Sequence, residues 1–100
     1  MDIVTQVKEL SSILGEIRIG NTLRKLAGIE AGRCLTRIER TKKELSVFEG
    51  RFQMESGTAW DEFNQGKLGD NADIMEWMAL YENLLDFQDQ YERISKSVIS

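Results

Sequence analysis

Apolar residues recur every three or four positions along most of this chain, and no proline interrupts the pattern. The strongest series lies near the C-terminal end. It consists of Trp77, Leu80, Leu84, Phe87, Tyr91, Ile94 and Val98. This spacing places side chains on one face of an α-helix. It predicts a helix over about residues 73–97 that packs lengthwise on another helix.

A second series has the same spacing earlier in the chain. It consists of Ala27, Ala31, Cys34, Ile38, Thr41, Leu45, Phe48 and Phe52. It predicts a long helix over residues 22–53, about 48 Å in length at 1.5 Å per residue. Because a compact domain of this size is shorter, another helix or a second chain must cover part of it.

The N-terminal residues predict a further amphipathic helix over about residues 3–18. Its apolar positions are Ile3, Val7, Leu10, Leu14 and Ile17. Gly20-Asn21 then predicts a stop or a bend. Two helices, or one helix with a kink, are both compatible with this sequence.

Ser56 is expected to cap a short helix over about residues 57–65, and a turn-rich segment follows it. No β-type alternation occurs anywhere in the sequence. The expected fold class is therefore all-α: an antiparallel helical bundle or coiled-coil hairpin of three main helices and the short one. One hundred residues are expected to form a single domain, 1–100, in which residues 1–20 hold the N-terminal helix and 54–72 the short helix and turn.

Small residues form a patch in the first turns of the long helix: Ala27, Gly28, Ala31 and Gly32. Each glycine costs a helix about 1 kcal/mol relative to alanine. Close approach of another helix, either residues 3–17 or a second copy in a homodimer, offsets that cost in one interpretation. In the other, the helix begins only near Glu30.

The residue inventory excludes several kinds of chemistry. The chain has no histidine, which removes the commonest general base and the commonest metal ligand. The lone Cys34 lies on the apolar series and is expected to be buried. We therefore expect no enzyme, catalytic residue, cofactor or metal site. No secretory signal and no apolar run long enough to span a membrane are present, so a cytoplasmic protein is expected.

Charge divides unevenly between the two halves. Residues 1–50 hold 9 basic and 7 acidic residues, a net of +2, and residues 51–100 hold 4 and 10, a net of −6. An acidic half disfavours a nucleic-acid partner and suits a basic protein surface. Arg33, Arg37 and Arg40 share one helical face, which we expect to be solvated or docked on the acidic half.

Three acids open the last predicted helix: Asp70, Asp73 and Glu76. Asp73 and Glu76 have the spacing of a capping box, and acids in a first turn also favour the helix dipole. Capping is therefore the expected role. A Mg²⁺ or Ca²⁺ site and a polar contact with a partner are the alternatives.

Most aromatic residues lie in the second half of the chain. Trp77 falls on the predicted seam, whereas Tyr81 lies at its edge, where the hydroxyl can stay hydrated. Core packing is the simplest role for them. Aromatic side chains with an acidic rim are also typical of protein-binding hot spots, so Trp60, Phe63, Trp77 and Tyr81 are candidates for partner contact.

Residues 48–81 resemble a group of small acidic helical proteins of archaea and bacteria. Their pattern is E-K-Y-G-M, S-x-E-E-F, F-x-x-G-E-L-G-D-D and D-x-x-E-W-A-A-L-Y-E. Here it reads FEGRFQM, SGTAWDEF, FNQGKLGDNAD and DIMEWMALYE. Eleven residues fall in register without a gap: Met54, Phe63, Gly66, Leu68, Gly69, Asp70, Asp73, Glu76, Trp77, Leu80 and Tyr81. The sequence departs from the pattern at Gly50, Ala59 and Lys67.

Such proteins resemble antitoxins, which bind small toxins encoded beside them. The resemblance implies a non-enzymatic interaction protein that covers a basic partner. The residues expected to contact that partner are Trp60, Phe63, Asp70, Asp73, Trp77 and Tyr81. A self-associating, dimeric structural protein is the alternative, with the small-residue patch at its interface.

Overall fold

The computed structural model describes the backbone of residues 3–99 and the side chains of residues 20–96. Three helices account for almost all of it: α1 (Ile3–Phe52), α2 (Ser56–Asn64) and α3 (Ala72–Ile99). The described residues include no strand, and the prediction of an all-helical chain is confirmed for them.

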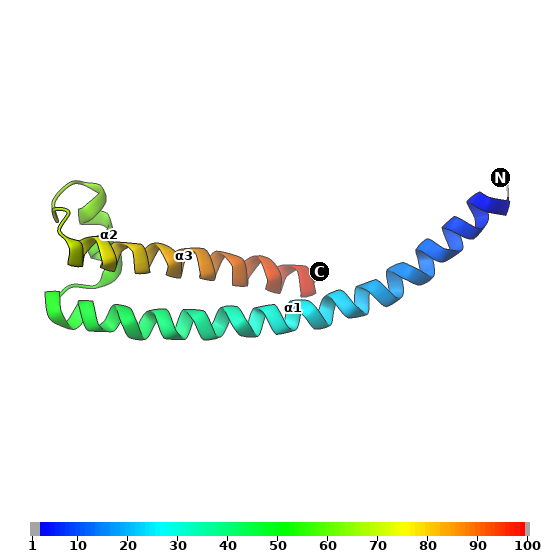
Figure 1. The fold of residues 1–100 in the computed structure, drawn as a ribbon, viewed down its shortest axis with the longest axis horizontal. Helices are drawn as coiled ribbons and strands as arrows, with labels where there is room; N and C mark the ends of the chain where they lie inside the picture. Colours follow the sequence, from blue (N-terminus) through cyan, green and yellow to red (C-terminus); the bar gives the residue numbers. More distant parts are fainter. Residues whose placement is uncertain (1–2, 100) are drawn as a thin grey trace.

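Helix α1 is continuous over 50 residues, so the division into helices 3–18 and 22–53 is wrong and the alternative of a single helix is the one observed. Glycine lowers helix propensity but keeps its backbone N–H, and the hydrogen-bond ladder can pass through Gly20. Asn21 accepts a hydrogen bond from Arg24 one turn later, at 3.3 Å. The helix curves along its length instead of breaking (Figure 1).

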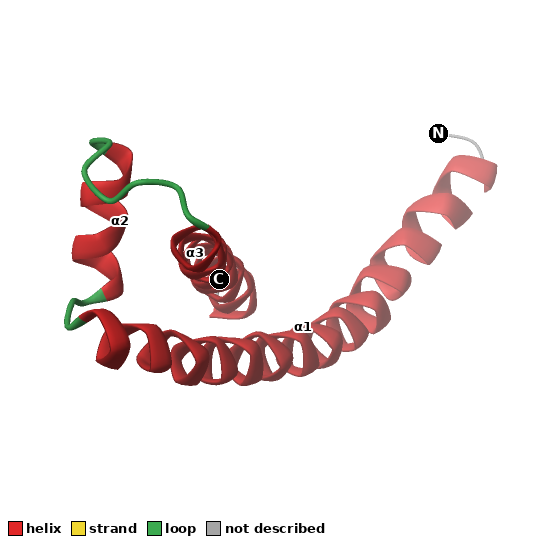
Figure 2. Ribbon diagram, turned by 60° about the vertical axis from the view of Figure 1, so that its left-hand side comes forward, coloured by secondary structure: helices red, strands yellow, loops and turns green. Residues whose placement is uncertain are grey.

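Helix α3 returns alongside the second half of α1 (Figures 1 and 2). At one end Arg51 pairs with Asp73, at 2.8 Å. Further along, the Arg37 guanidinium lies 5.9 Å from the centre of the Phe87 ring. Helix α2 stands at the end of the pair where α1 stops and α3 starts (Figure 2).

The core lies where the three helices meet. It consists of Ile38, Leu45, Ala59, Ile74, Trp77, Met78 and Leu84. Trp77 is fully buried and stacks on Phe48 and Phe52, with ring centroids 6.1 and 5.2 Å away. Such aromatic contacts stabilise a pair by about 0.5–1.5 kcal/mol beyond the burial of area.

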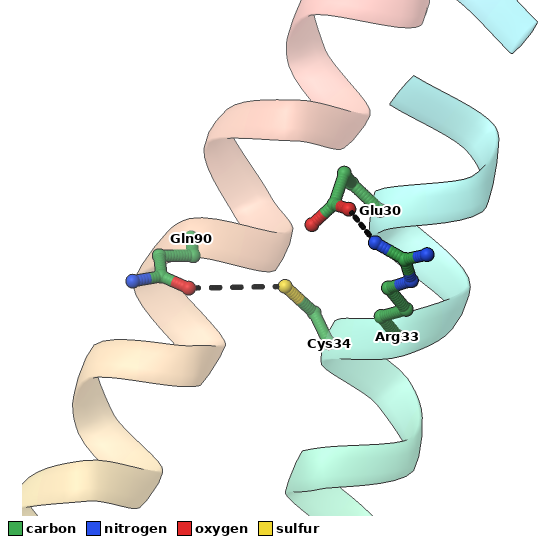
Figure 3. A network of polar contacts seen from close by, with 4 residues as sticks. All are labelled: Glu30, Arg33, Cys34 and Gln90. Carbon is green, nitrogen blue, oxygen red and sulfur yellow. Dashed lines mark hydrogen bonds and ion pairs between the residues drawn. The ribbon is translucent and has the colours of Figure 1, made fainter. Parts of the chain in front are cut away.

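Half of the predicted α1 seam is buried and the other half is half-buried; Cys34 is among the buried residues, as expected for a small apolar side chain. Its thiol lies 3.9 Å from the side-chain oxygen of Gln90 on α3 (Figure 3). Glu30 and Arg33 form an exposed ion pair beside it, at 2.7 Å. Ile74 and Met78 are also buried, although the α3 periodicity did not include them.

The starts of α2 and α3 differ from their predicted caps. Glu55 occupies the N-cap position of α2 without a side-chain hydrogen bond, and Ser56 is the first helical residue. Asn71 caps α3, because its side-chain oxygen accepts the Ile74 N–H at 2.9 Å. Asp73 pairs with Arg51 and does not serve as the cap.

The loop between α2 and α3 turns at two glycines in the left-handed region, Gly66 at φ +75° and Gly69 at φ +81°. A side chain is strained there, because its Cβ approaches the neighbouring carbonyl. These two glycines lie in the G-x-L-G-D segment that carries the resemblance. The corner into α3 therefore requires them for backbone reasons alone.

The first part of α1 projects beyond the body. Both helices meet at the α2 end, and α1 has 50 residues against 28 in α3. The difference leaves about 22 residues, 3–24, without α3 beside them, and we call this segment the N-terminal projection (Figure 1). The molecule accordingly measures 68 × 24 × 21 Å.

Candidate functional site

Two of the predicted contact residues meet where α2 packs on α3. The rings of Trp60 and Tyr81 lie 5.5 Å apart at an interplanar angle of 47°. Both side chains are half-buried, so each keeps part of its surface in solvent. The Tyr81 hydroxyl reaches back to the start of α2, 3.3 Å from where a Cβ would lie on Gly57.

A polar clamp fixes the start of α2 under this aromatic pair. Ser56 is buried, and its hydroxyl accepts a hydrogen bond from the Trp77 indole N–H, at 2.9 Å. Its backbone N–H donates to a carboxylate oxygen of Glu49, at 2.8 Å. Glu49 thus accepts from one of the N–H groups that the start of a helix leaves without an intrahelical partner.

Beside the clamp, the three helices enclose a cleft of about 410 Å³. Its lining comes from all of them: Lys42, Leu45, Glu49, Glu55, Ser56, Gly57, Tyr81 and Leu84. The volume falls in the range of small-ligand sites, about 300–1,000 Å³. We refer to it as the junction cleft.

Among the residues of the junction cleft, only Tyr81 was predicted from the sequence as a contact residue. Lys42 and Glu49 lie on α1, and Glu55 lies in the connection to α2. Lys42 and Glu49 are seven positions apart on one face of α1, but only the fold brings Glu55 and the residues of α2 and α3 to that face. The sequence carries no signal by which this cleft could have been found.

The remaining predicted contact residues lie elsewhere. Phe63 is half-buried near the end of α2, and Asp70 is exposed in the loop with no hydrogen bond or ion pair among the described residues. Asp73 is held by Arg51. Trp77 has no exposed surface, so it can support the site but cannot touch a partner in this conformation.

Asp70, Asp73 and Glu76 do not form a cation cluster. Within the described part of the chain, no group of three or more acidic or cysteine side chains could hold a metal ion. Asp73 points its carboxylate at the Arg51 guanidinium instead. The acids at this corner serve the α1–α3 contact and the surface charge.

The surface of α2, the loop and α3 is strongly acidic. Three of the ten acids in residues 51–100 form ion pairs, namely Asp73, Asp89 and Glu92. The other seven have no ion-pair partner among the described residues: Glu55, Asp61, Glu62, Asp70, Glu76, Glu82 and Asp86. Lys67 is the one base of this half without an ion pair in the same described range. We call this surface the acidic face.

The ion pair between Glu92 and Lys96 on α3 changes the pKa of Glu92. Lys96 donates a hydrogen bond to Glu92 at 2.9 Å, and its positive charge acts in the same direction. Together they lower the pKa of Glu92 below its ordinary value. This carboxylate stays charged in mildly acidic solution, and Lys96 balances its charge.

The predicted self-association residues lie where the N-terminal projection leaves the body. No atom lies within 4 Å of the position that a Cβ would take on Gly28 or Gly32. The expected close helix approach therefore does not occur within the described chain. Around them Leu23, Leu26 and Ile29 are exposed by 57%, 51% and 47%. This cluster forms an uncovered apolar surface.

The chain matches no protein-family model, and comparisons with curated proteins and with solved structures give no match. Within the described residues, no helix is long and apolar enough to cross a membrane.

Proposed function

We propose that this chain is a non-enzymatic protein-interaction module, an antiparallel helical hairpin that covers a basic partner protein. The observation that carries the proposal is the acidic face, with seven uncompensated carboxylates against Lys67. Like charges gathered on one surface raise the association rate with an oppositely charged partner and discriminate against acidic ones. Half-exposed aromatic side chains next to such a surface are suited to anchoring the complex.

The partner expected from the resemblance is a small toxin encoded beside this chain. In that role the module acts by occlusion, with the acidic face laid over a basic active or nucleic-acid-binding surface. Trp60, Phe63 and Tyr81 are the proposed anchors, and Asp70 is a proposed polar contact. Asp73 and Trp77 support the corner from within.

Co-expression with the product of the adjacent gene, followed by affinity capture, tests the proposal. We expect a complex whose association rate falls as salt rises. Neutralising Glu76, Glu82 and Asp86 to the corresponding amides should slow association, whereas neutralising Glu39 and Glu44 on α1 should not. The absence of a complex, or equal association rates for the two variants, contradicts the proposal.

Self-association is a second candidate, and the uncovered apolar surface favours it. Most of the stability of a helix in a protein comes from packing of its apolar face. The backbone of the N-terminal projection has no α3 beside it (Figure 1). We propose that the projections of two copies cover each other, with Gly28 and Gly32 allowing close approach.

Sedimentation velocity between 1 and about 100 µM tests self-association, a range that brackets typical weak dimers. We expect a concentration-dependent dimer, and the Leu23→Glu/Leu26→Glu variant should be monomeric. Val47→Glu is the matched control, because Val47 is 68% exposed on the part of α1 that α3 accompanies. A wild-type monomer at the highest concentration rules this candidate out.

A further inference from the structure

We propose that the junction cleft is a binding site for one arginine side chain, supplied by the basic partner. This inference rests on the proposed function and assigns it an anchoring position. The cleft receives lining residues from all three helices, and Glu55 of the acidic face is one of them. It is distinct from the aromatic and loop residues that the sequence singled out, apart from Tyr81.

The cleft has an apolar floor suited to an aliphatic stem. Leu45 of α1 and Leu84 of α3 line it, and both are almost fully buried in the core beneath. Arginine carries three methylene groups that pack on apolar surface while the guanidinium stays near water. An arginine in the cleft would therefore place its stem against the small exposed edges of these two leucines and present its charge at the rim.

The rim favours a cation over an anion. Two carboxylates, Glu49 and Glu55, face one ammonium group, Lys42. The Glu55 side chain makes no hydrogen bond or ion pair among the described residues. Glu49 already receives the Ser56 N–H, which removes the donor that an anion at the start of α2 would use first.

Gly57 and Tyr81 favour a guanidinium over an ammonium group. With no Cβ on Gly57, the Tyr81 hydroxyl has space beside the cleft, and an added Cβ would lie 3.3 Å from it. A planar guanidinium can stack on a tyrosine ring and pair with two acceptors at once, whereas an ammonium group is a strongly hydrated point charge. We therefore expect arginine to bind more tightly than lysine.

The test is an NMR titration of the full chain with the tripeptide acetyl-Gly-Arg-Gly-amide. Amide signals of Ser56 and Gly57 and ring signals of Tyr81 should shift with the peptide concentration. The lysine peptide should shift the same signals with weaker affinity, and the isosteric citrulline peptide should leave them unchanged. Equal shifts with citrulline, or shifts spread over the whole acidic face, overturn the proposal.

Three variants sharpen the titration. Glu55→Gln should weaken arginine binding by about two- to fivefold, the range of an exposed ion pair. Lys42→Met should strengthen it, because the competing cation is removed. Glu39→Gln is the control: it removes one exposed carboxylate outside the cleft and outside the acidic face, and it should not change the affinity. Equal weakening by Glu55→Gln and Glu39→Gln contradicts the proposal.

Capture of the partner separates this inference from the proposed function. If wild-type protein binds the partner and Glu55→Gln binds it equally well, the junction cleft is not the anchor, although the module does bind a basic protein. If the arginine peptide binds in the cleft and no partner is captured, the cleft inference stands and the proposed function fails.

Competition by free arginine tests whether the ligand is a protein side chain. Free arginine should compete with the peptide only weakly, because its own carboxylate is repelled by Glu49 and Glu55. Tighter binding of free arginine than of the peptide overturns the assignment to a protein side chain.

Discussion

At the scale of single residues, Ser56 connects two parts of the molecule that are 21 positions apart. Its hydroxyl is the partner of the buried Trp77 indole, and its N–H is the partner of Glu49. The sequence indicated a capping serine, which is a local role. Its actual role is a tertiary contact, because the start of α2 lies against the core residue Trp77 of α3.

Ser56→Ala should lower the free energy of unfolding by about 1–3 kcal/mol, because it leaves the Trp77 N–H buried without an acceptor. Urea denaturation measures this change. Thr58→Ala, an exposed position in the same helix, is the control and should change stability by less than about 0.5 kcal/mol. A loss at Ser56 no larger than that at Thr58 would show that the bond contributes nothing.

Glu92 gives a prediction in pH. Because Lys96 lowers its pKa in the folded state, the pair stabilises the protein above the unfolded pKa of a glutamate. That contribution is lost as the pH falls through the lowered, folded pKa. Lys96→Met should raise the pKa of Glu92 in a carbon-detected NMR titration, whereas Arg93→Met should not. An unchanged pKa in Lys96→Met contradicts this cause.

At the scale of elements, the sequence predicted some of the helix boundaries and buried faces and missed others. Periodicity predicted that α1 and α3 exist and which faces they bury, since Cys34, Ile38, Leu45 and Trp77 are buried as expected. It failed at Gly20-Asn21, where a break requires more than a weak helix former. It also missed the burial of Ile74 and Met78, which are buried on the flanks of the predicted seam.

The start of α3 offers a direct comparison between the predicted and the observed cap. Asn71→Ala should lower stability by about 1 kcal/mol, the usual effect of losing an N-cap. Asp73→Asn should cost less, about 0.2–1 kcal/mol, because it removes an exposed ion pair. Thermal unfolding of the two variants measures the difference. A larger loss at Asp73 would restore the capping box suggested by the sequence.

Glycines of the loop and of α1 should respond in opposite directions. Gly66→Ala should lower stability by about 1–2 kcal/mol, because alanine is strained at φ +75°. Gly32→Ala should raise it by about 1 kcal/mol, because it lies in a helix with open space around it. Urea denaturation at low protein concentration compares them. A destabilised Gly32→Ala would mean that another surface packs on this glycine.

At the scale of the whole molecule, the shape is the feature least visible in the sequence. The radius of gyration is 21.6 Å, against about 13 Å for a compact domain of 100 residues. The sequence predicted a long helix over residues 22–53 that another helix or a second chain must cover, which is part of the observed α1. Tyr81 alone among the predicted contact residues lines the junction cleft, because the cleft depends on how three helices meet. The place where α1, α2 and α3 come together cannot be predicted from amino-acid composition.

The body and the N-terminal projection should differ in protection from hydrogen exchange. Amides of residues 20–24 should exchange much faster than those of residues 34–45, because only the latter lie under α3. Mass spectrometry or NMR of dilute protein measures the ratio. If the projection pairs with a second copy, its protection should rise with concentration while that of residues 34–45 stays constant. Equal protection in dilute protein contradicts the division.

Because Trp77 is stacked in the core, its fluorescence should report whether the protein is folded. Trp77 of α3 is shielded by Phe48 and Phe52, which both lie on α1, while Trp60 keeps contact with solvent. Emission from Trp77 should be shifted to shorter wavelengths and resist quenching by iodide, and Trp60 should be quenched. A partner bound over the acidic face should lower the emission of Trp60 or protect it from iodide, and should leave the emission of Trp77 unchanged. One chain thus carries separate fluorescent reporters for folding and for complex formation.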